Sequence, residues 1–330
     1  MSFPNTRLRR LRYNSLLREL VSETQLSVND LIYPLFVCEG EKIKNEIPSM
    51  PGQFQFSIDN LIKKCKQVQE KGIKAILIFG VSKNKDKTGD IACSENSIVQ
   101  RAIKAIKEEN INLLLIADVC NCEYTSHGHC GTIVDGDVEN DLTLNTLAKQ
   151  SLSLVRAGAD IIAPSDMMDG RVQAIRKVLD SSGFYKVPIL SYSAKYASSF
   201  YSPFRDAADS SPKGFDRKTY QMNYSNSDEA IREVEQDVLE GADMIMIKPA
   251  LSYLDIISKV KQNFSLPIVA YSVSGEYSMI KAASLNNWIN ENDMMMETIN
   301  SIKRAGADII ITYYALEIAD VLNKKNNELQ

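Results

Sequence analysis

The stretch Gly241-Ala-Asp-Met-Ile-Met-Ile-Lys248 contains a junction between a helix and a buried strand. The glycine suits the left-handed residue that ends many helices, and the apolar run after Asp243 suits a strand covered on both faces. The same Gly-Ala-Asp tripeptide begins at Gly158 and Gly306, again before an apolar run. The chain therefore repeats a unit in which a helix leads directly into a parallel strand.

Apolar runs of strand length alternate with helix-period segments along the whole chain. The expected strands are 31–38, 74–79, 112–119, 160–164, 188–195, 243–248, 267–272 and 308–313. The expected helices are 59–71, 95–109, 142–157, 170–181, 227–240, 253–263 and 294–305. Continuously apolar strands separated by helices indicate a parallel sheet, which for eight strands most economically closes into a barrel. We therefore expect an α/β protein with a TIM (β/α)₈ barrel over residues 31–330. An open doubly wound sheet is the alternative, although no glycine-rich phosphate loop follows the first strand.

The composition is that of a globular protein, with 44% hydrophobic residues, 24% charged residues and a formal net charge of −4. This mild acidity argues against nucleic acid as the main partner. No apolar stretch reaches the roughly 18 residues of a membrane span. Six cysteines without a secretory signal favour reduced thiols or metal ligands over disulfides. We expect a cytoplasmic protein.

Residues 1–30 precede the first expected strand and are expected to form an arm. This segment is basic over residues 7–12, and its leucines have no local surface against which to bury. They are Leu8, Leu11, Leu16, Leu17 and Leu20. An unpartnered apolar surface of this kind predicts packing on another subunit.

Two lysines end strand-like runs, Lys195 after Val187-Pro-Ile-Leu-Ser-Tyr-Ser-Ala and Lys248 after the stretch quoted first. A lysine on a buried strand is unusual, because burial of an ammonium costs free energy unless the charge is paired or the pKa falls. A lysine with a lowered pKa is a nucleophile towards carbonyl groups. The pair therefore predicts Schiff-base catalysis at the carboxyl ends of two strands, where the active sites of such barrels lie.

Three cysteines fall close together in Asp118-Val-Cys120-Asn-Cys122-Glu-Tyr-Thr-Ser-His127-Gly-His129-Cys130. Three thiolates suit Zn²⁺ and leave a fourth position open for water or substrate, as in catalytic zinc sites. Two other interpretations stay open. A histidine, His127 or His129, would close a structural site as a fourth ligand, or the thiols would simply be buried without metal.

The connection over residues 196–225 lacks a convincing helical pattern, and a structureless segment of this length is usually a lid. We predict an active-site lid over about residues 197–225. It carries Arg205 and Arg217, whose guanidinium groups match the two oxygens of a carboxylate.

Five stretches resemble the porphobilinogen synthase family, also called 5-aminolevulinate dehydratase: 118–131, 191–205, 246–250, 273–277 and 309–314. The resemblance covers essentially the whole chain. It implies the condensation of two 5-aminolevulinate molecules to porphobilinogen with loss of two waters, in tetrapyrrole (haem) biosynthesis. Lys248 matches the lysine that forms a Schiff base with the first substrate, and Lys195 matches the lysine that holds the second.

The resemblance also implies how the substrate carboxylates are bound. Ser274 and Tyr313 match the hydroxyl groups that bind the carboxylate of the first substrate. On the lid, Arg205, Arg217 and Gln221 match the groups that bind the carboxylate of the second.

A further set of residues is implied near the amine of the second substrate. Asp118 and Ser165 match polar residues that line this part of the cavity. The cysteines Cys120, Cys122 and Cys130 match the ligands of a catalytic zinc. The family also has an aspartate-rich form of this loop, and the cysteine-rich form implies zinc rather than magnesium in the active site.

Two features outside the cavity complete the resemblance. Glu233 matches a glutamate that binds an allosteric magnesium in some members, and residues 1–30 match an arm that embraces a neighbouring subunit. The resemblance therefore implies a homo-oligomer in which dimers assemble into an octamer. Some members of the family form smaller assemblies, and the sequence leaves this alternative open.

Two other classes of protein explain part of the pattern. A class I aldolase on the same barrel would use one Schiff-base lysine, but it needs neither the second lysine nor the three cysteines. A zinc-binding or redox-sensing protein would use the cysteines but would leave Lys195 and Lys248 unexplained.

Overall fold

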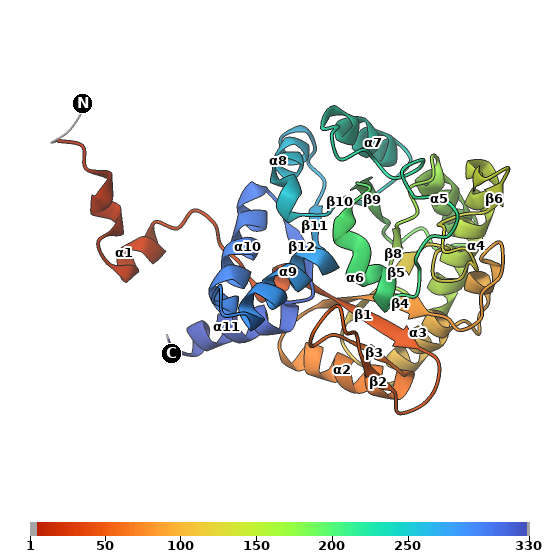
Figure 1. The fold of residues 1–330 in the computed structure, drawn as a ribbon, viewed down its shortest axis with the longest axis horizontal. Helices are drawn as coiled ribbons and strands as arrows, with labels where there is room; N and C mark the ends of the chain where they lie inside the picture. Colours follow the sequence, from red (N-terminus) through yellow and green to blue (C-terminus); the bar gives the residue numbers. More distant parts are fainter. Residues whose placement is uncertain (1–4, 329–330) are drawn as a thin grey trace.

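A computed structural model describes residues 5–328 of the chain. Eight parallel strands form a barrel, which lies among the helices in Figure 1. The strands follow the order β8-β5-β4-β1-β12-β11-β10-β9. Their bounds are β1 Leu31–Cys38, β4 Ala75–Val81, β5 Leu114–Val119, β8 Ile161–Pro164, β9 Leu190–Lys195, β10 Met244–Lys248, β11 Ile268–Ser272 and β12 Ile309–Thr312. The two ends of this order meet where Ile162 pairs with Ile189 and donates to the carbonyl of Pro188 at 3.1 Å. The predicted barrel is confirmed.

Helices surround the strands (Figure 1). All seven expected helices are present, with ends that differ from the prediction by a few residues: α2 Ile58–Glu70, α3 Ile98–Glu108, α4 Asn140–Ala157, α5 Arg171–Ser181, α7 Asp228–Leu239, α8 Leu254–Asn263 and α10 Glu291–Ala305. The sequence did not predict the helices α9 Ser274–Leu285 and α11 Ala315–Glu328. It also did not predict the short strand pairs β2 Lys44–Glu46 with β3 Phe54–Phe56, and β6 Ile133–Val134 with β7 Asp137–Val138.

The Gly-Ala-Asp repeat has two structural roles. Its glycines follow α4, α7 and α10 with φ angles of 110°, 104° and 123°, in the left-handed region that favours glycine. Its aspartates anchor the neighbouring strand, because each carboxylate accepts a hydrogen bond from a backbone N–H at or next to the start of that strand. The pairs are Asp160 with Leu115 (2.8 Å), Asp243 with Ile189 (2.8 Å) and Asp308 with Ile268 (2.9 Å).

The prediction of a lid without helix is wrong at its start. A 3₁₀ turn at Ser199–Tyr201 runs into the short helix α6, Ser202–Ala207, which has a proline in its first turn. Proline is tolerated there because the first N–H groups of a helix have no intrahelical partner. A six-residue helix is too short to show an apolar period, so the pattern did not reveal it.

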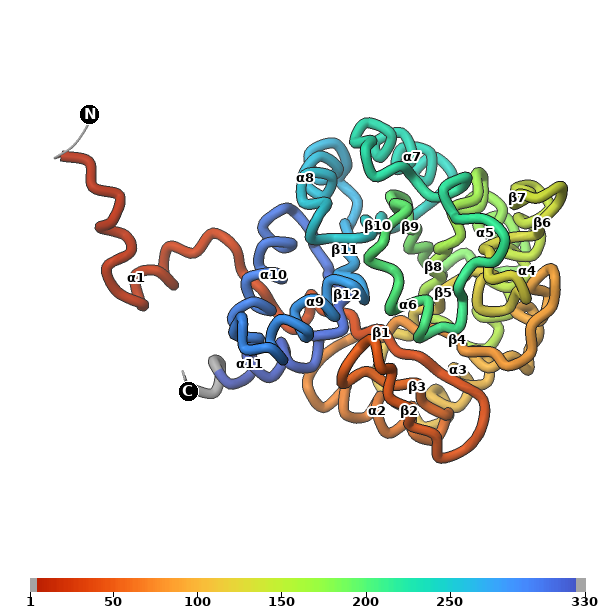
Figure 2. Tube along the Cα trace, viewed as in Figure 1, coloured from red at the N-terminus to blue at the C-terminus, as the bar shows by residue number. Residues whose placement is uncertain are grey.

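The N-terminal segment extends away from the barrel (Figures 1 and 2). It contains a 3₁₀ helix, Leu8–Arg12, and the helix α1, Ser15–Leu20, and neither contains a buried residue. Leu8 is 71% exposed and Leu20 is 81% exposed. These leucines are thus exposed in the single chain, and their contact with another subunit stays a prediction.

None of the described helices combines the length and the apolar character that crossing a membrane requires.

Candidate active site

The two lysines lie opposite each other at the carboxyl end of the barrel. Strands β9 and β10 pair in parallel with Lys195 in register with Lys248, and these side chains are only 5% and 4% exposed. The ammonium of Lys195 donates a hydrogen bond to the carbonyl of Ser165, whose hydroxyl donates to Oδ2 of Asp118 at 3.0 Å. Barrel closure thus brings together four of the predicted residues: Asp118 on β5, Ser165 directly after β8, Lys195 on β9 and Lys248 on β10.

Four aromatic rings surround the amine of Lys248. Its Nζ lies 4.4 Å from the ring centre of Tyr271, 5.1 Å from those of Tyr192 and Phe204, and 5.2 Å from that of Tyr201. Rings attract a cation, but they supply no water to solvate it. Burial, helped by the charge of Lys195, lowers the pKa of Lys248 to about 7. A substantial fraction of this amine is therefore neutral, and nucleophilic, at neutral pH.

The carboxyl group of Asp118 is also perturbed. Burial raises its pKa to about 6, although the charges of Lys195 and Lys248 act in the opposite direction. A carboxyl group with such a pKa can accept and return a proton near neutral pH.

Ser274 and Tyr313 are connected to the rings around Lys248. The hydroxyl of Tyr313 is 3.0 Å from that of Tyr271, whose ring contacts Lys248. The hydroxyl of Ser274 donates to the carbonyl of Phe200 at 3.2 Å and accepts from the N–H of Phe204 at 3.0 Å. Ser274 therefore joins the start of α9 to the start of the predicted lid, residues 197–225.

Gly275 permits this close approach of α9 to the lid. A Cβ atom at this position would lie 2.6 Å from the carbonyl oxygen of Phe200, so the backbone there would have to shift. The next residue, Glu276, is buried and accepts hydrogen bonds from the N–H groups of Val273 (2.6 Å) and Ala250 (3.2 Å). The start of α9 is thus built from small and polar residues that hold the end of β10 beside the lid.

Residues of the predicted lid have unused hydrogen-bonding groups. Both polar atoms of the buried Gln221 side chain, and Nε of both Arg205 and Arg217, have no hydrogen-bond partner within the described part of the chain. Burial and the nearby charge of Arg217 lower the pKa of Arg205. Buried groups left unpaired cost about 1–3 kcal/mol each, and two adjacent cations repel. A bound anion such as a carboxylate would relieve both penalties.

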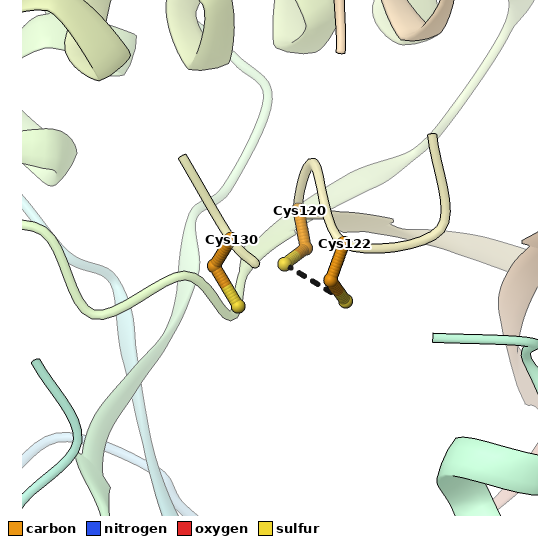
Figure 3. A group of neighbouring side chains, drawn as sticks. All are labelled: Cys120, Cys122 and Cys130. Carbon is orange, nitrogen blue, oxygen red and sulfur yellow. Dashed lines mark hydrogen bonds between the residues drawn. The ribbon is translucent and has the colours of Figure 1, made fainter. Parts of the chain in front are cut away.

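The three predicted cysteines form one buried cluster, with Cys120 and Cys122 on one turn and Cys130 on a separate segment (Figure 3). Their sulfur atoms lie within 4.8 Å of one another, and those of Cys120 and Cys122 are 3.3 Å apart. Bonds of about 2.3 Å to a tetrahedral zinc place two sulfurs about 3.8 Å apart, so the cluster fits this ion. Hydrogen bonds from Cys120 and Cys122 hold the pKa of Cys130 well below its usual range, which favours a thiolate ligand.

Neither histidine joins this cluster. Nε2 of His127 lies 3.0 Å from the carbonyl of Lys87, and both ring nitrogens of His129 contact lid residues. Over residues 5–324, where side chains are described, the group of metal-binding side chains consists of the three cysteines alone. The arrangement therefore supports the open zinc site over the closed structural one.

Comparison with known proteins agrees with this geometry. A sequence profile of the family described as delta-aminolevulinic acid dehydratase matches residues 5–321. The chain belongs to the delta-aminolevulinic acid dehydratase family.

Similar relatives cover almost the whole chain. The delta-aminolevulinic acid dehydratase of Methanothermus sociabilis is 58% identical over 97% of this chain and 99% of its own length. The delta-aminolevulinic acid dehydratase of Synechocystis is 55% identical over 96% of this chain and 98% of its own length. The crystal structure of the Toxoplasma gondii enzyme in complex with its reaction product porphobilinogen has a TM-score of 0.93 and 48% identity, over 96% of this chain and 91% of that one. The resemblance inferred from the sequence is confirmed, and the chain is an enzyme, a lyase of the dehydratase type.

The sequence missed the aromatic surroundings of Lys248 in this dehydratase. Tyr201 and Phe204 fall within the predicted lid, and Tyr192 and Tyr271 fall within expected strands, but none of the four was singled out. A large aromatic residue a few positions before the end of a barrel strand is the one available signal, because it points to the same end of the barrel as the lysines. Such residues are also ordinary in a core.

Glu233 lies outside this site, on α7. It is half-buried beside a cavity of about 390 Å³ whose lining is mostly charged: Asp169, Gly170, Arg171, Glu229, Arg232, Glu233, Gln236, Asp237 and Glu240. Burial raises the pKa of Glu233 to about 7, against the opposing charge of Arg171. The structure therefore gives Glu233 acidic neighbours, but it does not bring Glu233 to the lysines.

Proposed function

We propose that this dehydratase condenses two molecules of 5-aminolevulinate to porphobilinogen with loss of two waters, and so supplies tetrapyrrole (haem) biosynthesis. The observation that supports this proposal most strongly is the pairing of Lys195 with Lys248 in register. It places two buried amines side by side at one end of the barrel. The family match and the product complex of the Toxoplasma gondii enzyme support the same reaction.

Lys248 forms the first imine in this proposal. Its neutral amine attacks the ketone carbon of one 5-aminolevulinate, the carbonyl oxygen leaves as water with the two amine protons, and a C=N bond replaces the C=O bond. The aromatic rings around Nζ exclude water from this imine and so slow its hydrolysis. Ser274 and Tyr313, on the same side, bind the carboxylate of this substrate.

Lys195 holds the second 5-aminolevulinate in the same way. Asp118 and Ser165 lie next to it, and a carboxyl group whose pKa is about 6 can shuttle protons between the substrate amine and the reacting carbon. Arg205, Arg217 and Gln221 bind the second carboxylate with the groups that are otherwise unpaired. The two lysines are released when the carbons they hold become part of the product ring.

Cys120, Cys122 and Cys130 hold a catalytic zinc in this proposal. A zinc held by these three thiolates would supply a Lewis acid close to Lys195, whose charge acts on Cys130. The donor set supports zinc over magnesium, since thiolates are soft ligands and Mg²⁺ takes oxygen ligands.

Porphobilinogen formation with and without a zinc chelator tests both proposals. We expect activity that the chelator removes and added zinc restores, and a Cys122→Ala variant that loses bound zinc and most activity. Cys93→Ala is the matched control, because Cys93 is a half-buried thiol that contacts the carbonyl of Thr146 instead. Full activity in the chelator would remove the zinc proposal and leave the lysines, whereas no product with zinc and reduced thiols present would refute the condensation.

Glu233 is proposed to bind an allosteric magnesium. Its cavity offers several carboxylates and room for water ligands, which Mg²⁺ usually keeps. We expect Mg²⁺ to stimulate the wild-type enzyme and not a Glu233→Gln variant. Glu235→Gln, which alters an exposed carboxylate on the same helix, should respond as the wild type does. Equal stimulation of both variants would refute this site.

The assembly is proposed to be a homo-octamer held by the N-terminal arm. The exposed leucines on an arm without buried residues support an intersubunit contact. Replacing Leu16 and Leu20 by aspartate should then lower the mass of the assembly in analytical ultracentrifugation, and an unchanged mass would contradict the proposal.

A cytoplasmic location is supported by six free cysteines, which fit a reducing compartment, and cell fractionation would test it.

A further inference from the structure

We propose that His129 is a positioning residue that couples metal binding at the cysteine cluster to docking of the lid. The inference deepens the proposed function, because it takes Cys120, Cys122 and Cys130 as zinc ligands and residues 197–225 as the lid. His129 immediately precedes Cys130, yet its side chain contacts the lid rather than the cluster.

The ring of His129 is fully buried, and both of its ring nitrogens contact residues of the lid. It stacks on Phe215, with ring centres 3.8 Å apart and planes inclined by 16°. Its Nε2 lies 3.2 Å from the carbonyl oxygen of Lys213, and its Nδ1 lies 3.0 Å from the hydroxyl of Tyr220. A carbonyl oxygen only accepts hydrogen bonds, so Nε2 carries the proton and Nδ1 accepts from Tyr220. The tautomer and orientation of the ring are therefore set by the lid.

The backbone around His129 is bound to the lid as well. Lys213 donates from its backbone N–H to the carbonyl of His127 and from Nζ to that of Ser126, both at 2.9 Å. Arg217 donates from Nη2 to the carbonyl of Gly128 at 2.7 Å. A Cβ atom on Gly128 would overlap the carbonyl oxygen of Ser211, so the two backbones are in direct contact there. Residues 126–130 and 211–220 thus form one docked surface.

Metal binding acts on this surface through chain connectivity. Cys120 and Cys122 directly follow β5, whereas Cys130 arrives from a separate segment that ends with His129. An ion held by all three sulfurs therefore restrains His129 relative to the barrel, in the position that docks the lid. Coupling of this kind is reciprocal, so a docked lid strengthens metal binding by the same factor that metal binding stabilises docking.

The coupling has a consequence for the second substrate. Tyr220 lies between Arg217 and Gln221, the lid residues proposed to bind the second carboxylate. When the lid is docked, these groups are in place, and when it is released they are not. Loss of the His129 contact should therefore weaken binding of the second substrate in addition to any effect on the metal.

The test uses Tyr220→Phe, which keeps the ring, removes one hydroxyl and alters no proposed metal ligand. Thr219→Val is the matched control, because it removes a hydroxyl from the neighbouring lid residue whose hydrogen bond goes to Asp137 at 2.8 Å. Trypsin cleavage after the exposed residues Lys213 and Lys218 is followed by mass spectrometry, on full-length protein without substrate, with zinc and with a chelator. Zinc affinity is measured by competition with a chromogenic chelator.

We expect zinc to slow lid cleavage at least about fivefold in the wild type and in Thr219→Val, the lower end of ordinary coupling between sites, and less than twofold in Tyr220→Phe. The zinc affinity of Tyr220→Phe should fall by a similar factor. His129→Phe, which keeps the stack on Phe215 and loses both hydrogen bonds, should behave as Tyr220→Phe does. Both variants should need more substrate for half-saturation of the second site.

Three results would overturn the inference: lid cleavage that ignores zinc in the wild type, equal zinc protection in Tyr220→Phe and the wild type, or equal loss of protection in Thr219→Val. A protein that makes porphobilinogen but fails these tests would keep the proposed function without the coupling. A protein that passes them but makes no porphobilinogen would keep the coupling and refute the condensation.

Discussion

Lys248 and Lys195 occupy matching positions on neighbouring strands, but their surroundings differ. Lys248 lies among aromatic rings, with the hydroxyls of Ser274 and Tyr313 beyond them. Lys195 contacts the carbonyl of Ser165 next to Asp118, and its charge reaches the cysteine cluster, where it helps to lower the pKa of Cys130. One half of the site is therefore apolar around its amine, and the other half is polar.

The difference separates two tasks. An apolar surrounding withholds water, which lowers the pKa of an amine and protects an imine from hydrolysis. A polar surrounding supplies partners for protons and charge, which a second substrate with a free amine and a carboxylate requires. In the proposed reaction, two lysines on neighbouring strands therefore have different roles because their neighbours differ.

The largest expected effect comes from removing either lysine. Lys248→Met and Lys195→Met should each reduce porphobilinogen formation about 1,000-fold or more, because no other group in the cavity can form the missing imine. The two variants should differ when borohydride traps imines of 5-aminolevulinate. Lys195→Met should still be labelled at Lys248, whereas Lys248→Met should lose the dominant label. Activity within tenfold of wild type in either variant would contradict the two-imine proposal.

A smaller effect is expected from the polar half alone. Arg205→Ala removes a charged partner of the second carboxylate and should raise the substrate concentration for half-saturation of the second site roughly 10- to 100-fold, with less effect on maximal rate. Lys218→Ala removes an exposed cation from the same lid and is the control. A fall in maximal rate with unchanged half-saturation would assign Arg205 to another role.

The sequence predicted the barrel and the site residues for related physical reasons. Strands buried on both faces are continuously apolar, and closure of a parallel barrel brings every carboxyl end to one face. Residues such as Asp118, Ser165, Lys195 and Lys248 could therefore be grouped without coordinates. Their roles came from the resemblance to the family and stay predictions. The comparisons confirm the family itself.

The parts that the sequence missed depend on contacts between distant residues. Helix α9 begins with Ser274, Gly275 and Glu276, which are buried against the lid and β10, so its first turn shows no apolar period. Tyr271 looks like an ordinary core residue until β10 and β11 pair and bring it to Lys248. His129 was considered only as a metal ligand, because its partners Lys213 and Tyr220 lie 84 and 91 residues away.

The smallest expected effect is a shift in the pH dependence of imine formation at Lys248. It is also the sharpest test of how the apolar surroundings of Lys248 and the polar surroundings of Lys195 influence each other. The pKa of Lys248 is lowered to about 7, and only the neutral amine attacks a carbonyl. Borohydride labelling of Lys248 with 5-aminolevulinate should therefore be level above about pH 7 and fall about tenfold for each pH unit below it.

Two substitutions in the polar half should move the acid limb of this pH profile, the fall in labelling below about pH 7, in opposite directions. The charge of Lys195 lowers the pKa of Lys248, so Lys195→Met should move the limb to higher pH. The carboxylate of Asp118 raises the pKa of Lys248, so Asp118→Asn, which keeps the shape of the side chain, should move it to lower pH. Limbs that stay in place in both variants would mean that burial among the aromatic rings alone sets the pKa of Lys248. Opposite shifts would mean that Lys195 and Asp118, in the polar half, also set the pKa of the Lys248 amine on the neighbouring strand.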